Sequence, residues 1–357
     1  MNINRKRRWR IIRTFGLGWV AAFVFLSIVR GSGTIEEGSV ELGLPQAIGM
    51  SIVLGSIFGG LAGVVQVLIE EHAYKRMSLR RLLTLRIIFS FVSLVSLVLL
   101  AYLLFGVILG VPVGLVEFFI EPGSFAIFFY ILSADLFLFS LRQVNLLLGE
   151  GNLWKLLRGR FYAPREEERI FMFLDLESST THAEALGHIT YSKLIQDCFD
   201  DLGIVADNEA QVYQYLGDGV VLSWSLEDGV RDHNCVRAFL RFRELIGARG
   251  CYYQDTYQRR PRFTAGVHVG EVVVTEVGRH KKEIAYHGDT INTAARIQGQ
   301  CRPLNAELLI SRTLAETLDS GALPTRDLGD VKLRGKERSL GLVAVQVEGS
   351  SLGQPEV

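Results

Sequence analysis

The sequence has few cysteines, and the first half of the chain has none. All four lie in the second half, at Cys198, Cys235, Cys251 and Cys301. Their spacing matches no metal-binding motif, so a cysteine-ligated metal centre is not indicated. We interpret them as reduced thiols in the core of a cytosolic domain.

The chain also lacks a net charge and shows no internal repeat. Its 38 Lys and Arg residues balance its 38 Asp and Glu residues. The first 160 residues carry 16 basic and 9 acidic residues, whereas acidic residues are in excess in the remainder. Without a large positive surplus, strong attraction to nucleic acid is not expected, and we predict no nucleic-acid partner.

Long apolar segments are abundant in the first half. The sequence is 49% hydrophobic and its mean hydropathy is +0.25, which is high for a purely soluble protein. Four apolar segments, at about 14–30, 44–69, 84–108 and 122–143, are long enough to cross a bilayer or nearly so. We predict a four-helix transmembrane bundle over residues 1–148. The alternative for the first segment is a signal peptide, but it has no clear small-residue cleavage site and three further spans follow.

The charged residues between these segments predict the orientation in the membrane. Basic residues precede the first segment, separate the second from the third, and follow the fourth. The two other loops carry only acidic residues, at Glu36, Glu37, Glu41, Glu117 and Glu121. By the positive-inside rule, the N-terminus and the second half of the chain are cytoplasmic. The sequence thus predicts an integral protein of the inner or plasma membrane, with the lipid bilayer as a partner.

Two features of the apolar segments admit two interpretations each. Small residues recur every four positions at Ser51, Gly55, Gly59 and Gly63, a pattern that lets two helices approach closely. The partner helix is either in the same bundle or in a second copy of the chain. Asp135 is an acid inside a span, where it needs a partner, and Arg86 lies at a suitable depth. That pair is either structural or part of an ion- or signal-sensing site.

The junction and the boundaries follow from composition. Residues 149–165 mix leucine, Trp154 and basic residues, which is typical of an amphipathic helix, until Pro164 interrupts the pattern. We predict a junction helix or linker over 149–165 and a soluble domain over 166–347. The last ten residues, 348–357, are predicted to be a disordered tail.

The soluble half alternates strand and helix patterns. An apolar strand is expected over 169–176, with hydroxyls at 178–181 capping the helix that follows it to about residue 201. Gly217-Asp218-Gly219 predicts a hairpin, and a second hairpin is expected over 262–277, turning at Gly270-Glu271. With helices over 228–247 and 290–299, the order is β-α-β-β-α-β. This order predicts a ferredoxin-like α+β domain with helices on one face of the sheet.

Asp175 and Asp218 are the candidate metal ligands. Each follows a predicted strand at a tight turn, and paired strands would bring them together. Mg²⁺ prefers oxygen ligands and usually takes one or two carboxylates plus phosphate oxygens. Two such ions can activate a hydroxyl and neutralise a leaving pyrophosphate. The plain alternative is that Asp175 caps a helix and Asp218 is a turn residue.

Other candidate residues surround a phosphorylated ligand in this interpretation. Ser178, Ser179 and Thr180 form a small-residue helix N-terminus, whose free N–H groups can bind a triphosphate. Asn292 and Arg296 are one helical turn apart and share a face. The amide suits a ribose, and the guanidinium suits charge on a phosphoryl group in transit.

A basic loop near the C-terminus is the last candidate for phosphate binding. We favour Arg334 as the residue that contacts the terminal phosphates, with Lys332 and Lys336 as competitors. For His268, on a predicted hairpin, a structural role is favoured over a metal-ligand or acid–base role.

Residues 169–347 resemble the catalytic domain of the class III adenylate/guanylate cyclases. The matching strings are FLDLESST, YLGDGVVLSW, FTAGVHVGEVV, GDTINTAARIQ and LRGKE, in the family's order. The resemblance implies metal binding by Asp175 and Asp218, ribose binding by Asn292, and transition-state stabilisation by Arg296. It places Arg334 where the family usually has a phosphate-binding lysine. It also implies a homodimer in which the two acids of one subunit face Asn292 and Arg296 of the other.

The sequence departs from the family where the purine is read. Adenylate cyclases often have lysine at the position of Gln214 and aspartate or threonine at that of Ala285. Glutamine can donate and accept hydrogen bonds, and alanine can do neither. We therefore predict an adenylate cyclase that makes cyclic AMP from ATP with two Mg²⁺ or Mn²⁺ ions. The alternatives are a guanylate cyclase using GTP and a catalytically silent cyclase-like signalling module. The Gly-Gly-Asp/Glu-Glu-Phe turn of a diguanylate cyclase is not in the sequence.

Overall fold

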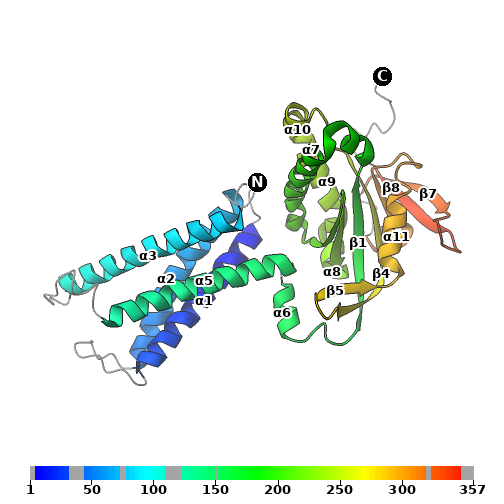
Figure 1. The fold of residues 1–357 in the computed structure, drawn as a ribbon. Coiled ribbons are helices and arrows are strands. Elements are labelled where there is room, and N and C mark those ends of the chain that lie inside the picture. Colours follow the sequence, from blue (N-terminus) through cyan, green and yellow to red (C-terminus); the bar gives the residue numbers. More distant parts are fainter. Residues whose placement is uncertain are drawn as a thin grey trace. The chain divides into compact units, whose positions relative to one another are not determined.

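The structure is a computed structural model that describes residues 5–31, 44–72, 78–108, 122–149, 151–318 and 323–346. These residues divide into two compact units, Met1–Leu147 and Leu148–Val357. Figure 1 shows the helices of the first unit and the sheet of the second. The predicted tail 348–357 and the acidic residues of the two loops lie outside the described residues.

The described part of the first unit consists of long helices. These are α1 (Arg5–Gly31), α2 (Leu44–His72), α3 (Leu79–Ile108) and α5 (Pro122–Leu148). Three of them, α1, α2 and α5, are by length and composition able to cross a membrane, among the residues described. The sequence therefore folds into candidate spans here, and a membrane bundle of four helices stays a prediction.

The stripe of small residues on α2 packs against α1 of the same chain. Ser51, Gly55, Gly59 and Gly63 are all buried. A Cβ atom on any of these three glycines would lie 2.7 Å from a backbone Cα of α1, closer than real contacts allow. Of the two interpretations, packing within one chain is the one that the structure supports, because α1 already covers the stripe.

This close contact predicts a difference between two adjacent glycines. A side chain at Gly59 would meet the backbone of Gly16 and Phe15, whereas a Cβ on Gly60 would meet nothing within 4 Å. Gly59→Leu should therefore destabilise the helix pair by about 1–3 kcal/mol or more. Gly60→Leu, the matched control, should leave the thermal unfolding temperature of the purified protein close to that of the wild type. Equal unfolding temperatures in both variants would contradict the packing.

Asp135 on α5 is paired with Arg86 on α3, as predicted. The guanidinium donates from Nε to Oδ2 over 2.7 Å and from Nη2 to Oδ1 over 2.5 Å, and Ser90 Oγ also donates to the carboxylate. Arg86 is 1% exposed and Asp135 is 3% exposed. A bidentate, hydrogen-bonded ion pair offsets the unfavourable free energy of placing an acid among apolar helices. A structural role therefore accounts for both residues.

The second unit is built on one eight-stranded sheet. Its order is β2-β3-β1-β4-β6-β8-β7, and β5 pairs with β4. The order of the first four strands is that of the predicted ferredoxin-like core, and β4 and β6 run parallel. The strands are β1 (Arg165–Leu176), β2 (Gln211–Leu216), β3 (Gly219–Ser225), β4 (Phe263–Val277), β5 (Glu283–His287), β6 (Leu308–Ser311), β7 (Thr325–Val331) and β8 (Leu340–Val345).

Helices cover both faces of this sheet, so the prediction of helices on one face is wrong (Figure 1). On β1, Ile170, Met172 and Leu174 point into the main core, where α7, α9 and α10 pack, whereas Phe171 points to the face that α11 covers. This alternation is the period of two expected along a strand. The helices of this unit are α6 (Asn152–Leu157), α7 (Ser179–Leu202), α8 (Leu226–Val230), α9 (Asn234–Ala248), α10 (Gly250–Tyr257), α11 (Asp289–Gln298) and α12 (Arg312–Thr317).

The predicted hairpin at Gly270-Glu271 is wrong. Residues 263–277 form the single strand β4, and both residues of the supposed turn pair with β1, Gly270 with Arg169 and Glu271 with Glu168. The cause is the length of β1, which begins at Arg165 and supplies partners to the far end of β4. The real partner of the second half of β4 is β5, which the sequence analysis did not find.

Three of the four cysteines are buried free thiols, as predicted. Burial raises the pKa of the thiols of Cys198, Cys235 and Cys301 to about 12. Cys251, at the start of α10, is exposed, so the prediction of a core position is wrong for this residue.

Candidate active site

The two candidate metal ligands lie at one end of β1 and the β2–β3 hairpin. Asp175 pairs in register with Gly219, and Asp218 is the residue just before it in the predicted hairpin turn. Asp175 Oδ1 lies 2.9 Å from where a Cβ of residue 219 would be. The glycine therefore leaves the space that this carboxylate occupies, and pairing of the strands brings the two acids together.

The electrostatics of this pair suit a divalent cation. Burial raises the pKa of the Asp175 carboxyl, and the negative charge of Asp218 raises it further, whereas a hydrogen bond with the Leu176 backbone acts in the opposite direction. Within the described residues, no Lys or Arg pairs with either carboxylate, and no group of three or more His, Cys, Asp or Glu residues forms a metal site. Two carboxylates are what Mg²⁺ takes when phosphate oxygens and water complete its shell, so the residues present fit the ion.

The turn after Asp175 leads directly into α7. Ser178 precedes the helix with a left-handed backbone (φ 55°), and its side chain makes no capping hydrogen bond. The predicted capping by hydroxyl side chains is therefore wrong at Ser178, because the left-handed backbone differs from the extended conformation of a usual N-cap. The backbone N–H groups of Ser179 and Thr180 open α7, and such N–H groups attract anions.

Asn292 and Arg296 lie on α11, as predicted. The helix lies close to β4, and the glycine at position 266 permits this approach. A Cβ atom there would be 2.1 Å from the backbone nitrogen of Gln298. Asn292 is exposed, and Arg296 is partly buried, with Nη1 3.5 Å from Oδ1 of Asp289. The two side chains are thus carried on a helix that is packed closely against the sheet.

The basic loop near the C-terminus passes beside Arg296. A Cβ on Gly335 would lie 3.7 Å from Arg296 Nη2, which places the loop next to the guanidinium. Arg334 is exposed, whereas Lys336 forms an ion pair with Asp289 at the start of α11. Of the three cations that the sequence offered in this loop, Lys336 is the one whose side chain contacts α11 in the described structure.

The two positions that depart from the family's purine pocket have aromatic neighbours that touch. Gln214 is an exposed residue of β2, just after a bulge at Tyr213, and Ala285, on β5, pairs with Thr275 of β4. The rings of Tyr213 and Tyr286 lie 5.0 Å apart, centre to centre. Positions 214 and 285 are thus each next in sequence to a residue of one aromatic cluster.

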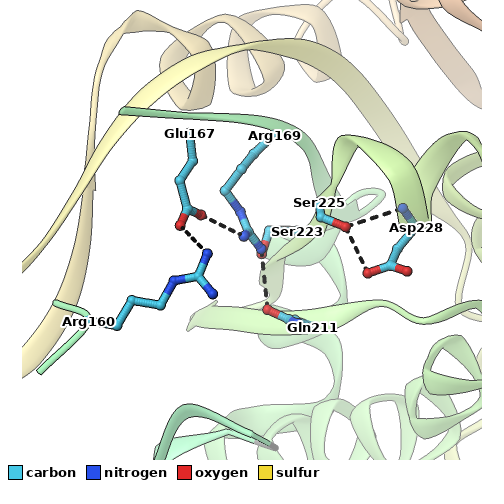
Figure 2. A network of polar contacts seen from close by, with 7 residues as sticks. All are labelled: Arg160, Glu167, Arg169, Gln211, Ser223, Ser225 and Asp228. Carbon is cyan, nitrogen blue, oxygen red and sulfur yellow. Dashed lines mark hydrogen bonds and ion pairs between the residues drawn. The ribbon is translucent and has the colours of Figure 1, made fainter. Parts of the chain in front are cut away.

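Sequence reasoning missed Arg169, a buried cation beneath this cluster. It is 4% exposed, and its Cζ lies 4.9 Å from the centre of the Tyr286 ring. Figure 2 shows its guanidinium bonded to Glu167, Gln211 and Ser223, over 3.1–3.3 Å. The sequence did offer an indication, since Arg169 is the basic residue that begins the apolar strand predicted over 169–176.

The same network reaches the junction before β1. Arg160 Nη2 lies 3.3 Å from Glu167 Oε1, and the other oxygen of that carboxylate accepts from Arg169 (Figure 2). Phe161 is buried, and its carbonyl accepts a hydrogen bond from the backbone of Glu276 on β4. Arg160 and Phe161, at the end of the junction, therefore contact the strands of the sheet directly.

His268 lies on β4, and its imidazole is hydrogen-bonded within the domain. Its Nδ1 lies 2.9 Å from Ser311 Oγ. Burial, together with the charge of Lys336, lowers the pKa of the His268 imidazole to about 4. The ring is therefore neutral at pH 7 and already hydrogen-bonded, in agreement with the structural role predicted for it.

The site residues fall into two groups in one chain. The acids Asp175 and Asp218 form one, and Arg296, with the basic loop, forms the other. No hydrogen bond or ion pair joins the two groups in the part of the chain that the structure describes. Paired carboxylates that can hold Mg²⁺ and a helix that carries an arginine together suit the class of ligands with phosphate groups.

Comparisons with known proteins agree with this class. The family model described as "Adenylate and Guanylate cyclase catalytic domain" matches residues 161–345. Adenylate cyclase 2 of Rhizobium meliloti (strain 1021) is 34% identical over 205 residues, which are 57% of this chain and 56% of that protein. An adenylate cyclase of Anabaena cylindrica is 24% identical over 183 residues, 49% of this chain and 36% of that protein.

Among solved structures, a bacterial light-regulated adenylyl cyclase has the same fold in this part of the chain. Its TM-score is 0.51 at 18% identity, with 58% of this chain and 60% of that chain covered. This chain spans about half, or less, of the length of the curated relatives that it matches. Because the family model covers more than half of the sequence, the chain belongs to the adenylate and guanylate cyclase catalytic domain family.

Proposed function

We propose that this protein is a membrane-anchored adenylate cyclase that converts ATP to 3′,5′-cyclic AMP and pyrophosphate as a homodimer. The observation that carries the proposal is the Asp175–Asp218 pair, two carboxylates placed together with no basic partner among the described residues. Membership of the cyclase family and the 34% identity to an adenylate cyclase support it.

In the proposed reaction the 3′-oxygen of ATP forms a bond to the α-phosphorus. The bond from that phosphorus to the oxygen bridging to the β-phosphate breaks, and pyrophosphate leaves. Asp175 and Asp218 would hold two Mg²⁺ or Mn²⁺ ions, which lower the pKa of the hydroxyl and neutralise charge on the leaving group. The proton passes to water or to a substrate phosphate oxygen, since positioning and electrostatics dominate phosphoryl transfer.

The other residues orient the substrate. Asn292 is exposed on α11, where its amide can bond the ribose, and Arg296 can stabilise charge on the phosphorus as it is transferred. The N–H groups at Ser178, Ser179 and Thr180 can bind the triphosphate together with Arg334.

A shared site across a dimer fits the separation of the two groups. No hydrogen bond or ion pair joins the acids to the α11 group within the described part of one chain. A twofold symmetric pair would place the acids of each protomer opposite the α11 group of its partner. The same pairing produces two equivalent sites.

The anchor and its orientation complete the proposal. The three helices that can cross a membrane support membrane association. The basic loops support a cytoplasmic N-terminus and a cytoplasmic catalytic domain. In that location the enzyme has access to cellular ATP.

The direct test is to incubate the purified full-length protein with ATP or GTP and Mg²⁺ or Mn²⁺. The products are identified by mass. Cyclic AMP with pyrophosphate is the expected result. Cyclic GMP alone would make the protein a guanylate cyclase, and no cyclic product from either nucleotide would favour a silent signalling module.

GTP is also a candidate substrate, because the residues at positions 214 and 285 do not match adenine alone. Gln214 is exposed, so its amide can rotate and present either its oxygen or its nitrogen to a purine. Ala285 offers no hydrogen bond. We therefore expect kcat/KM to favour ATP over GTP by much less than the roughly 10⁴-fold that a fully matched polar site reaches.

Restoring the family's residues should sharpen the choice. Gln214→Lys combined with Ala285→Asp should raise the ATP-to-GTP ratio of kcat/KM by about tenfold or more, since the pair can bond a ring nitrogen and the amino group of adenine. Val212→Lys, also exposed on β2 but before the bulge, is the matched control for added charge. A wild type that is already strictly specific, or a double variant no more selective, would exclude these two positions from base reading.

A further inference from the structure

Asp289, the first residue of α11, holds two cations of the candidate site. Its carboxylate forms an ion pair with Lys336 and lies 3.5 Å from Arg296 Nη1. Thr293 Oγ1 donates to it over 3.2 Å. The Lys336 hydrogen bond is the largest cause of a lowered pKa of the Asp289 carboxyl. An acid that no part of the proposed reaction uses thus lies between two cations.

The fold of the basic loop directs Lys336 to this position. Leu333 is 1% exposed and anchors the loop in the core beneath α11. Gly335 has a left-handed backbone (φ 71°), and the backbone N–H of Lys336 donates to the carbonyl of Leu333 over 3.1 Å. This tight turn exposes Arg334 and leaves the side chain of Lys336 26% exposed, against α11.

The charges around Lys336 predict that phosphate oxygens can replace Asp289 as its partner. Arg296 and Lys336 repel each other, and Asp289 neutralises one of the two charges. His268, on the sheet side, is influenced by the charge of Lys336 and is neutral at pH 7. Asp289 is 59% exposed, so a polyphosphate with several negative charges can displace it from the ammonium group.

We propose that Lys336 binds the terminal phosphates of the substrate, and that Asp289 is a positioning residue that holds Lys336 and Arg296 together until the substrate arrives. The inference rests on the proposed function, because it takes a nucleoside triphosphate as the ligand. It adds Lys336 to the phosphate site that sequence reasoning assigned to Arg334. On binding, the ammonium group exchanges the Asp289 carboxylate for phosphate oxygens, while Arg296 stays beside Asp289.

The test uses the full-length protein with inorganic tripolyphosphate and Mg²⁺ as the probe, and measures Kd by calorimetry. Lys336→Gln should weaken binding about tenfold or more, as expected for a lost charged hydrogen bond. Lys336→Arg should restore Kd to within about threefold of the wild type, since arginine keeps the charge. Lys332→Gln, in the same loop but exposed, is the matched control and should bind like the wild type.

Steady-state kinetics with ATP separate the two roles. Lys336→Gln should raise KM about tenfold with a smaller change in kcat, because the contact already exists in the ground state. Asp289→Asn keeps the shape and removes the charge, and it should lower kcat about tenfold without weakening tripolyphosphate binding, because Arg296 loses its orientation.

Several outcomes would overturn the inference. One is wild-type protein that does not bind tripolyphosphate. Another is Lys336→Gln protein that binds it normally but unfolds at a lower temperature, which would make Lys336 purely structural. If Asp289→Asn leaves kcat unchanged, Asp289 is not a positioning residue. If the wild type makes no cyclic nucleotide, the proposed function fails, and the tripolyphosphate measurements still decide the role of Lys336.

Discussion

Asp175→Ala and Asp218→Ala should each lower cyclase activity by about a thousandfold or more while the domain stays folded. Each substitution removes one carboxylate from a two-acid site, and metal ions held there would supply several kcal/mol of charge stabilisation. The measurement is the rate of cyclic nucleotide formation at saturating ATP and Mg²⁺, with circular dichroism to check the fold. Near-wild-type turnover in either variant would reject the metal assignment.

The same acids should destabilise the protein when no metal is present. Burial and the charge of Asp218 raise the pKa of the Asp175 carboxyl above its value in the unfolded chain. The folded state therefore binds this proton more tightly, so stability from this group is greatest at low pH and falls as pH rises from the unfolded pKa through the folded one. At pH 7 the ionised carboxylate opposes folding.

Asp175→Asn is the variant that exposes this effect. With EDTA at pH 7.5, it should unfold at a higher temperature than the wild type, although it is inactive. Asp197→Asn is the matched control, because Asp197 accepts hydrogen bonds from Tyr252 and Tyr257 over 2.6 and 2.7 Å and its loss should lower the unfolding temperature. If Asp175→Asn also lowers the unfolding temperature, the ionised carboxylate of Asp175 does not destabilise the folded state.

Local patterns predicted the parts of the fold that depend on short stretches of sequence. The Gly217-Asp218-Gly219 turn was identified because strand-like runs flank it on both sides, and the helix predicted over 290–299 is present as α11. The supposed turn at Gly270-Glu271 failed for the opposite reason. Its residues look like a turn in isolation, and only the length of β1 makes them part of β4.

The site was predictable to the same degree. Strand pairing brings Asp175 and Asp218 together, and pairing follows from the hairpin. The contact between Lys336 and Asp289 was not predictable, because it depends on the burial of Leu333 and the left-handed backbone of Gly335. Tertiary packing, which no local pattern encodes, decides which side chain of a basic loop faces the site.

In the first unit, the energetic cost of an unpaired acid predicted a contact more specifically than the stripe of small residues did. An acid among apolar residues needs a partner, and this need, together with the matching depth of Arg86, identified Arg86 as the partner of Asp135. The small-residue stripe states only that some helix approaches closely. Its partner, α1, was known only when the structure placed the α1 backbone against Gly59.

Mixing Asp175→Ala and Arg296→Ala subunits should restore activity that neither variant has alone. In a mixed dimer, the intact acids of one protomer face the intact α11 of the other, while the second site carries both defects. Each mixed dimer then has one intact site out of two, so mixed dimers purified through both tags should have about half of wild-type activity. The two variants are co-expressed with different affinity tags, and dimers are purified through both tags before the assay.

The choice of variants provides the control. Asp175→Ala mixed with Asp218→Ala should stay inactive, because both acids of a site come from the same protomer and every site in the mixed dimer lacks one of them. Recovery in this control would mean that the acids act from different chains. If verified mixed dimers of Asp175→Ala and Arg296→Ala show no recovery, the acids and α11 of one chain must form the site together. The separation of the two groups within a single chain would then have to close by a conformational change.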